Sequence, residues 1–404
     1  MVFGQQPKQR GGKRIIGTVA SVFFCFLCVL ILDSCTIQKE EVLCSQSNES
    51  AEPSSNVLEE FADVELEEFA DVELIPCETD GPQLNQYYIP DDMDVFYRPT
   101  ESSYGVISTD DPMKVEELIQ EARNIGLLAE DEVMAFNPYA DFYQGKYARD
   151  IEYYFDESIL AILWQENIDG MLCSFAEVKI ADPSQFRRKL ADDTFESPNQ
   201  FCATEFALQT NAVVALNADY YRFRRVGITV FDRELYRFNT DTYTGRYSQY
   251  NCVDTLCVNS NGDFLYFEMG EERSRDEVTA FIQDEDIIFS LSFGPILVKD
   301  GEPQYHNWYP LGEINDHYSR AGIGQIDHCH YLYMALNFGE LPPSWTVDQF
   351  AEHFAKKPVR TAYCLDGGQT AEVVFNGAPY NRVDYGSERE TSDILFFVTA
   401  IPSE

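Results

Sequence analysis

The second half of the chain, from about residue 172, alternates short apolar runs with turn residues. Residues 211–216, 227–231 and 362–365 each form such a run, made mostly of aliphatic and β-branched side chains. Runs of this length between turn residues are typical of buried strands. The pattern therefore predicts a domain rich in β-strands.

Two other patterns add a hairpin and helices to this picture. Residues 255–258 and 264–267 flank Asn261 and Gly262, a pair that favours a tight β-hairpin turn. Residues 346–355 and 111–126 show helical spacing instead. Their predicted buried faces consist of Val347, Phe350, Ala351 and Phe354 in the first and Val115, Leu118, Ile119 and Ala122 in the second. We therefore predict an α+β fold, a large mixed β-sheet with flanking helices.

The N-terminus has the pattern of a membrane anchor. Basic residues between Lys8 and Arg14 precede an uncharged stretch at 15–32, long enough to span a bilayer. The basic flank predicts that the N-terminus lies inside and the rest outside the cytoplasm. Cys35 leaves a lipoprotein cleavage site as an alternative. We predict residues 1–35 to be a signal or anchor and the location to be the cell membrane, with an extracytoplasmic domain.

The acidic segment after the anchor contains a short tandem repeat. The octapeptide Leu-Glu-Glu-Phe-Ala-Asp-Val-Glu occupies residues 58–65 and recurs at 66–73. A period of eight fits neither a helix nor a strand, and so short a repeat cannot bury a core. We interpret residues 36–85 as a disordered tether; partner docking is the alternative. We then expect an N-terminal extension at 86–165 and the main domain at 166–404.

The formal net charge of −40 limits the possible partners. Such a surface repels nucleic acid, so an anionic ligand must be held by a local group of arginines. No cofactor is predicted, and a divalent metal requirement stays open. His328 and His330 alternate within Asp-His-Cys-His, which suits either a turn or a shared metal ion.

The candidate catalytic and binding residues lie at the ends of predicted strands. Asp366 follows the apolar run at 362–365, and Gly367 and Gly368 permit close approach to the main chain. Three further motifs accompany it in order along the chain. They are Asn217-Ala218-Asp219, Arg320-Ala321-Gly322-Ile323-Gly324, and a C-terminal group with Asn381 and Glu388-Arg389. Together, from about residue 172 onward, this set resembles the phosphodiester glycosidase family.

The resemblance implies an α+β fold and hydrolysis of a sugar-1-phosphodiester, that is, of a phosphorylated glycan or sugar phosphate. It implies that Asp366 is the nucleophile, base or electrostatic stabiliser, and that Glu388 is an acid/base residue or orients Arg389. The expected substrate-binding residues are Asn217, Asp219, Arg320, Gly367, Gly368, Asn381 and Arg389. As alternatives, Asp366 caps a turn and the arginines form ion pairs.

Two departures from the family pattern leave a second function open. Ala218 and Asp219 stand where the resemblance implies two glycines, and Gln369 stands where it implies a small residue. These changes narrow the approach to the main chain and add a carboxylate. The alternative function is a noncatalytic carbohydrate-binding or envelope-assembly protein with the same fold. Oligomeric state is not indicated by the sequence.

Overall fold

The computed structural model describes residues 85–93, 95–111, 113–137, 147–219, 221–222, 227–239, 253–270, 273–306, 309, 316–339 and 342–402. The described residues all lie within one compact unit, Glu78–Glu404. The predicted anchor and the repeat lie outside the described residues. Within the described ranges, no helix is long and apolar enough to cross a membrane.

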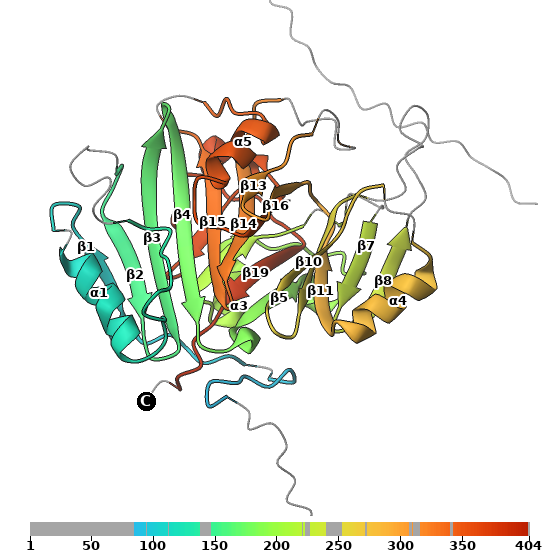
Figure 1. Ribbon diagram of the computed structural model, residues 1–404, viewed down its shortest axis with the longest axis horizontal. Helices are drawn as coiled ribbons and strands as arrows, with labels where there is room; N and C mark the ends of the chain where they lie inside the picture. Colours follow the sequence, from blue (N-terminus) through green and yellow to red (C-terminus); the bar gives the residue numbers. More distant parts are fainter. Residues whose placement is uncertain are drawn as a thin grey trace, which may run out of the picture. The chain divides into compact units, whose positions relative to one another are not determined.

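A nine-stranded sheet forms the centre of the domain (Figure 1). In spatial order its strands are β1 (Tyr104–Ile107), β2 (Ile151–Phe155), β3 (Ile159–Ile168), β4 (Met171–Ile180), β15 (His330–Asn337), β14 (Arg320–Asp327), β16 (Thr361–Leu365), β12 (Ile296–Lys299) and β13 (Glu302–Pro303). The strand pairs in it are antiparallel, whereas the sequence predicted a mixed sheet. Consecutive strands such as β3–β4 and β14–β15 form hairpins, which requires antiparallel pairing.

Two five-stranded sheets pack on one face of this large sheet. The first contains β10 (Phe264–Phe267), β9 (Thr255–Asn259), β11 (Ile287–Leu291), β7 (Gly227–Phe231) and β8 (Glu234–Asn239). The second contains β18 (Ala378–Pro379), β17 (Val373–Phe375), β6 (Val214–Asn217), β19 (Asp393–Phe397) and β5 (Phe186–Leu190). The predicted hairpin is confirmed as β9 and β10, with Phe264 paired to Val258.

Helices cover the outer faces of the sheets. α1 (Met113–Asn124) and α5 (Val347–Phe354) pack on the other face of the nine-stranded sheet, α3 (Ala203–Thr210) on the sheet of β6, and α4 (Arg275–Asp284) beside β8 and β11 (Figure 1). Both predicted helical faces are confirmed, because their apolar residues are buried. Thr346 caps α5, since its hydroxyl accepts from the Gln349 amide. An α+β fold is therefore confirmed.

The main apolar core lies between the nine-stranded sheet and the two smaller sheets. Side chains of β14 alternate, so that Ala321 and Ile323 face this core and the intervening residues face α5. Phe186 of β5 stacks on Phe397 with ring centroids 4.7 Å apart and meets Phe289 of β11 edge-on at 5.6 Å. The Phe186–Phe289 contact joins the two smaller sheets to one another.

Candidate functional site

The ends of β6 and β16, which belong to different sheets, are joined at Asp366. The Asp366 amide donates to the carbonyl oxygen of Ala218 at 3.1 Å. In return, the Asn217 side-chain amide donates to the carbonyl oxygen of Asp366 at 2.6 Å. Two motifs far apart in the sequence therefore meet at one point.

Asn217 is buried at this junction, where its hydrogen bonds are to other parts of the protein. Its side-chain oxygen accepts from the Tyr333 hydroxyl at 2.8 Å, and its main-chain amide donates to the Glu372 carbonyl at 3.1 Å. The residue is 1% exposed. Asn217 thus fixes the main chain at Asp366, since both ends of its amide are engaged by the protein.

The Asp366 carboxylate is held by its own turn. One oxygen accepts from the Gly367 amide and the other from the Thr370 hydroxyl, each at 2.9 Å. A Cβ atom at Gly367 would lie 2.6 Å from the carbonyl oxygen of Ser319, and Gly368 has a φ of +65°. Both glycines are therefore required by the turn and by its packing against the start of β14.

A small pocket opens at this carboxylate. It encloses only about 10 Å³, the space of a single water, and is lined by Gln200, Asp219, Asp366, Thr370, Arg389, Glu390, Thr391 and Ser392. Asp366 is partly exposed, whereas Arg389 is exposed and forms no hydrogen bond or ion pair with the described part of the chain. Three of the predicted site residues, Asp219, Asp366 and Arg389, thus come together.

A buried guanidinium supports Asp219 from behind. Arg188 Nη2 lies 2.6 Å from the Asp393 carboxylate and 3.8 Å from that of Asp219, and none of the three side chains is more than 2% exposed. The Asp219 carboxylate also accepts from the Ser292 amide at 2.8 Å. Burial, together with the nearby Asp219 charge, raises the pKa of Asp393 to about 7 despite the opposing effect of Arg188.

Glu388 faces the N-terminus of α3. Its carboxylate accepts from the Thr204 amide at 3.0 Å and from the Thr204 hydroxyl at 2.7 Å. Beside it lies the carboxyl group of Glu372, which is 2% exposed. Burial and the neighbouring Glu388 charge raise the pKa of Glu372 to about 8, so Glu372 is mostly protonated at neutral pH. Glu388 and Glu372 together fix the segment that carries Arg389.

Arg320 and Asn381 lie beside the pocket without lining it. The Arg320 guanidinium donates to the carbonyl oxygens of Trp345 and Asp316, and the residue is 7% exposed. The Asn381 side chain accepts from the Val373 amide at 2.7 Å and donates to the Ala371 carbonyl at 2.8 Å. These hydrogen bonds to main-chain atoms hold neighbouring segments in place.

Sequence reasoning missed Arg188, Glu372 and Asp393. The sequence held a signal for Arg188. Successive side chains of a strand at 186–190 point to opposite faces, so position 188 lies on the same face as Phe186 and Leu190. Glu372 and Asp393 are single acidic residues bordering apolar strands. Because charged residues are mostly exposed in proteins, nothing at either position indicates burial from the sequence alone.

The Asp-His-Cys-His motif has a structural role. His328 and Cys329 form the turn between β14 and β15, whereas His330 is fully buried. The two ring nitrogens of His330 lie 2.8 Å from Glu132 and 3.0 Å from Glu177. These partners raise the pKa of His330 against the opposing effect of its burial. Within the described ranges, no group of His, Cys, Asp and Glu is arranged to hold a metal ion.

Most of the residues that line this pocket lie in a segment that matches a known family. Residues 210–398 match the sequence profile of the phosphodiester glycosidase family. An uncharacterized protein of the SPbeta prophage of Bacillus subtilis, YomE, is 24% identical over 208 residues. The match covers 50% of this chain and 30% of YomE, so the chain spans less than a third of that relative's length.

Three solved structures are also similar. The zebrafish N-acetylglucosamine-1-phosphodiester alpha-N-acetylglucosaminidase catalytic domain, auto-inhibited by its pro-peptide, has a TM-score of 0.45 and 15% identity, covering 59% of this chain and 82% of that one. A hypothetical protein from Synechocystis has a TM-score of 0.44 and 13% identity, with 61% and 64% covered. A putative exported protein from Burkholderia pseudomallei has a TM-score of 0.38 and 11% identity, with 58% and 74% covered.

Proposed function

We propose that the protein hydrolyses a sugar-1-phosphodiester, and the match of residues 210–398 to the phosphodiester glycosidase family supports this proposal. Water adds across the bond between the anomeric carbon and the phosphate oxygen, and the products are a free sugar and a phosphomonoester. The observation that carries the proposal is the pocket shared by Asp219, Asp366 and Arg389. It combines carboxylates with a guanidinium that has no partner among the described residues.

We assign binding of the substrate phosphate to Arg389. A guanidinium offers two parallel N–H groups to two phosphate oxygens, which suits a phosphodiester better than a point charge does. Because the whole chain carries a formal charge of −40, an anionic substrate needs such a local cation. Arg320, in contrast, already donates to the carbonyl oxygens of Trp345 and Asp316.

We propose that Asp366 acts at the anomeric carbon of the sugar. Positive charge develops on that carbon as the bond to phosphate breaks, and a fixed carboxylate stabilises it. A phosphate leaves more readily than an alkoxide, so the reaction depends less on a proton donor. The Asp366 carboxylate either attacks the carbon or activates a water, and the anomeric configuration of the released sugar distinguishes the two routes.

We place the substrate in a cell-surface or secreted glycan and the domain outside the cytoplasm. This proposal rests on the basic residues before the uncharged stretch at 15–32. Protease added to intact cells should digest the domain. If digestion requires cell lysis, the proposed location is wrong.

Hydrolysis in ¹⁸O-labelled water tests the reaction. The purified protein is incubated with a panel of sugar-1-phosphodiesters, and the products are examined by mass spectrometry. We expect the label at the anomeric hydroxyl of the sugar. Label in the phosphate would mean that the phosphorus–oxygen bond is cleaved, which would contradict a glycosidase. Binding without any turnover would favour a noncatalytic carbohydrate-binding protein.

Matched variants test the assigned residues. Asp366→Asn should keep substrate binding and abolish turnover, since the amide preserves shape and loses charge. Arg389→Gln should weaken substrate binding, and Arg389→Lys should recover only part of it. Arg382→Gln removes an exposed arginine that does not line the pocket, and it should bind and turn over as wild type.

A further inference from the structure

A second, larger cavity lies away from the pocket at Asp366. This groove measures about 580 Å³, a volume suited to a small ligand, and it shares no lining residue with that pocket. It runs between β5 and the β7–β8 turn, and Tyr88, Asp91, Asp92, Met93 and Phe96 line one side. Partly exposed apolar side chains form part of its lining, namely Met93, Phe96, Phe231 and Ile288. An apolar surface is therefore available next to charged groups.

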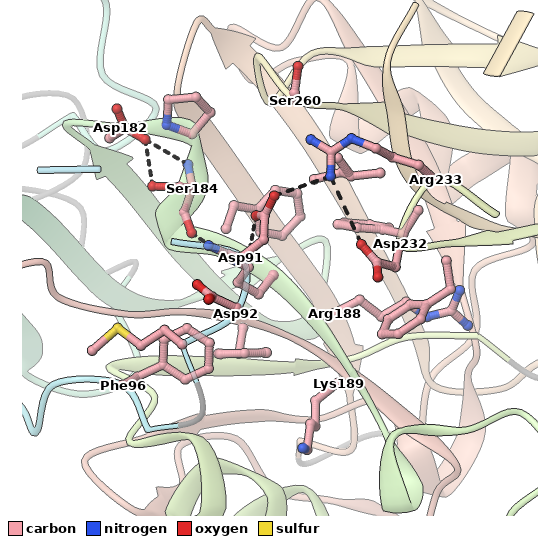
Figure 2. Close-up of a pocket in the computed structure, with 18 of the residues that line it drawn as sticks. Asp91, Asp92, Phe96, Asp182, Ser184, Arg188, Lys189, Asp232, Arg233 and Ser260 are labelled. Atoms are coloured by element: carbon pink, nitrogen blue, oxygen red, sulfur yellow. Dashed lines mark hydrogen bonds and ion pairs between the residues drawn. The ribbon is translucent and has the colours of Figure 1, made fainter. Parts of the chain in front are cut away.

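Two arginines from different sheets converge in this groove on one carboxylate. Arg187 Nη1 lies 3.0 Å from one oxygen of Asp91, and Arg233 Nη1 lies 3.2 Å from the other. Figure 2 shows the Asp91 carboxylate directed at Arg233, with neighbouring Asp92 directed away from it. The Asp91 side chain is 51% exposed, so solvent reaches this ion pair.

Both guanidiniums are held independently of Asp91. Arg187 donates through Nε to the Ser184 carbonyl and through Nη2 to the Ile89 carbonyl. Arg233 donates through Nε to Asp286 at 2.7 Å. Removal of the Asp91 carboxylate would therefore leave two preoriented forks aimed at the same place, which is the arrangement that binds phosphate or carboxylate groups.

We propose that Arg187 and Arg233 form an anion-binding site for a phosphate or carboxylate group carried on a sugar or apolar body, and that Asp91 of the chain itself fills this site in the structure. The ligand anion replaces the Asp91 carboxylate between the two guanidiniums, and the body of the ligand lies along the aromatic lining. The site is separate from the proposed hydrolytic pocket, so its existence does not depend on the proposed reaction.

The test compares two neighbouring substitutions in the full chain. Asp91→Ala and Asp92→Ala each remove one negative charge from the same groove, but Asp92 has no ion pair or hydrogen bond among the described residues. Inorganic phosphate is titrated into each variant by calorimetry. We expect phosphate to bind Asp91→Ala about tenfold more tightly than Asp92→Ala, because charge-assisted hydrogen bonds become free. Added salt should weaken this binding.

A double variant identifies the groups that hold the anion. Adding Arg233→Gln to Asp91→Ala should abolish the gain in phosphate affinity. Asp91→Asn serves as the second single variant if Asp91→Ala does not fold. Equal phosphate affinity of the Asp91 and Asp92 variants, or a gain that survives Arg233→Gln, would overturn the proposal. A parallel titration with acetate ranks the anions: tighter phosphate indicates a phosphate ligand, and tighter acetate a carboxylate.

Discussion

The side-chain amide of Asn217 donates to the main-chain carbonyl of Asp366 at 2.6 Å, while its oxygen accepts from the Tyr333 hydroxyl. Asp366 is thus positioned by a residue from a different sheet. The position of the carboxylate in the pocket therefore depends on how the two sheets are joined and also on the turn that follows β16.

Asn217→Ala should lower both stability and turnover. The substitution leaves the Asp366 carbonyl without this donor and the Tyr333 hydroxyl without this acceptor, which should lower the free energy of unfolding by about 1–3 kcal/mol. Turnover should fall because the main chain at Asp366 is no longer held. Urea denaturation and product release measure the two effects. Tyr333→Phe is the control: it should lose stability and keep near wild-type turnover.

Arg188→Met should be strongly destabilising. It leaves the Asp219 and Asp393 carboxylates buried without their cation, and breaking a buried ion pair in this way costs about 3–5 kcal/mol. Asp393→Asn in the same chain should recover part of the loss by removing one charge. Chemical denaturation measures each variant. Lys189→Met is the matched control, because its more exposed pair with Asp193 should contribute less than about 1 kcal/mol.

Glu372→Gln should remove a pH dependence of stability. Glu372 releases its proton near pH 4.5 when unfolded and near pH 8 when folded. Between these values the folded state holds the extra proton, so stability falls as pH rises. Relative to Glu372→Gln, wild type should lose about 1.4 kcal/mol per pH unit across that window.

Urea denaturation from pH 4 to 9 provides this measurement. Glu388→Gln should narrow the window, because the Glu388 charge is the second cause of the raised pKa of Glu372. Parallel stability curves for wild type and Glu372→Gln would show that Glu372 ionises in the folded state as it does in the unfolded state.

Two truncations should bracket the start of the stable domain. Removal of residues 1–84 should leave the free energy of unfolding unchanged, because the short acidic repeat at 58–73 cannot bury a core. Removal through Phe96 also deletes Ile89, which is 1% exposed, and the contact of Phe96 with Phe396. We expect a loss of about 3 kcal/mol or more for the second truncation, from burial of these side chains alone. Thermal unfolding compares the two.

The sequence predicted the helices and the hairpin, because these depend on the spacing of residues that are close together in the chain. The buried face of α5, from Val347 to Phe354, follows from a period of 3.6, and the β9–β10 hairpin follows from the Asn-Gly turn. The pairing of distant strands does not follow from such patterns. β1 and β2, from the predicted N-terminal extension, are strands of the same sheet as β14 and β16.

The site was predictable in position but less so in detail. The sequence predicted that Asn217, Arg320, Glu388 and Arg389 would converge with Asp366 in one cleft. Of these four, only Arg389 lines the pocket with Asp366, together with Asp219. The direction of a long side chain depends on which carbonyl groups lie near it, as Arg320 shows. Charges that are buried in pairs, such as Arg188 with Asp393, break the apolar pattern on which prediction relies.

The place of β19 in its sheet determines the order of events during synthesis. β19 lies between β5 and β6 and pairs with both, although it is made long after them. During synthesis on the ribosome, the edges of β5 and β6 that pair with β19 therefore stay unpaired until β19 is made. Unpaired strand edges favour association between chains. Asp393, which supports Asp219 through Arg188, arrives with β19. A nascent chain that stalls before residue 393 would thus lack the pocket and expose two strand edges to other unfinished chains.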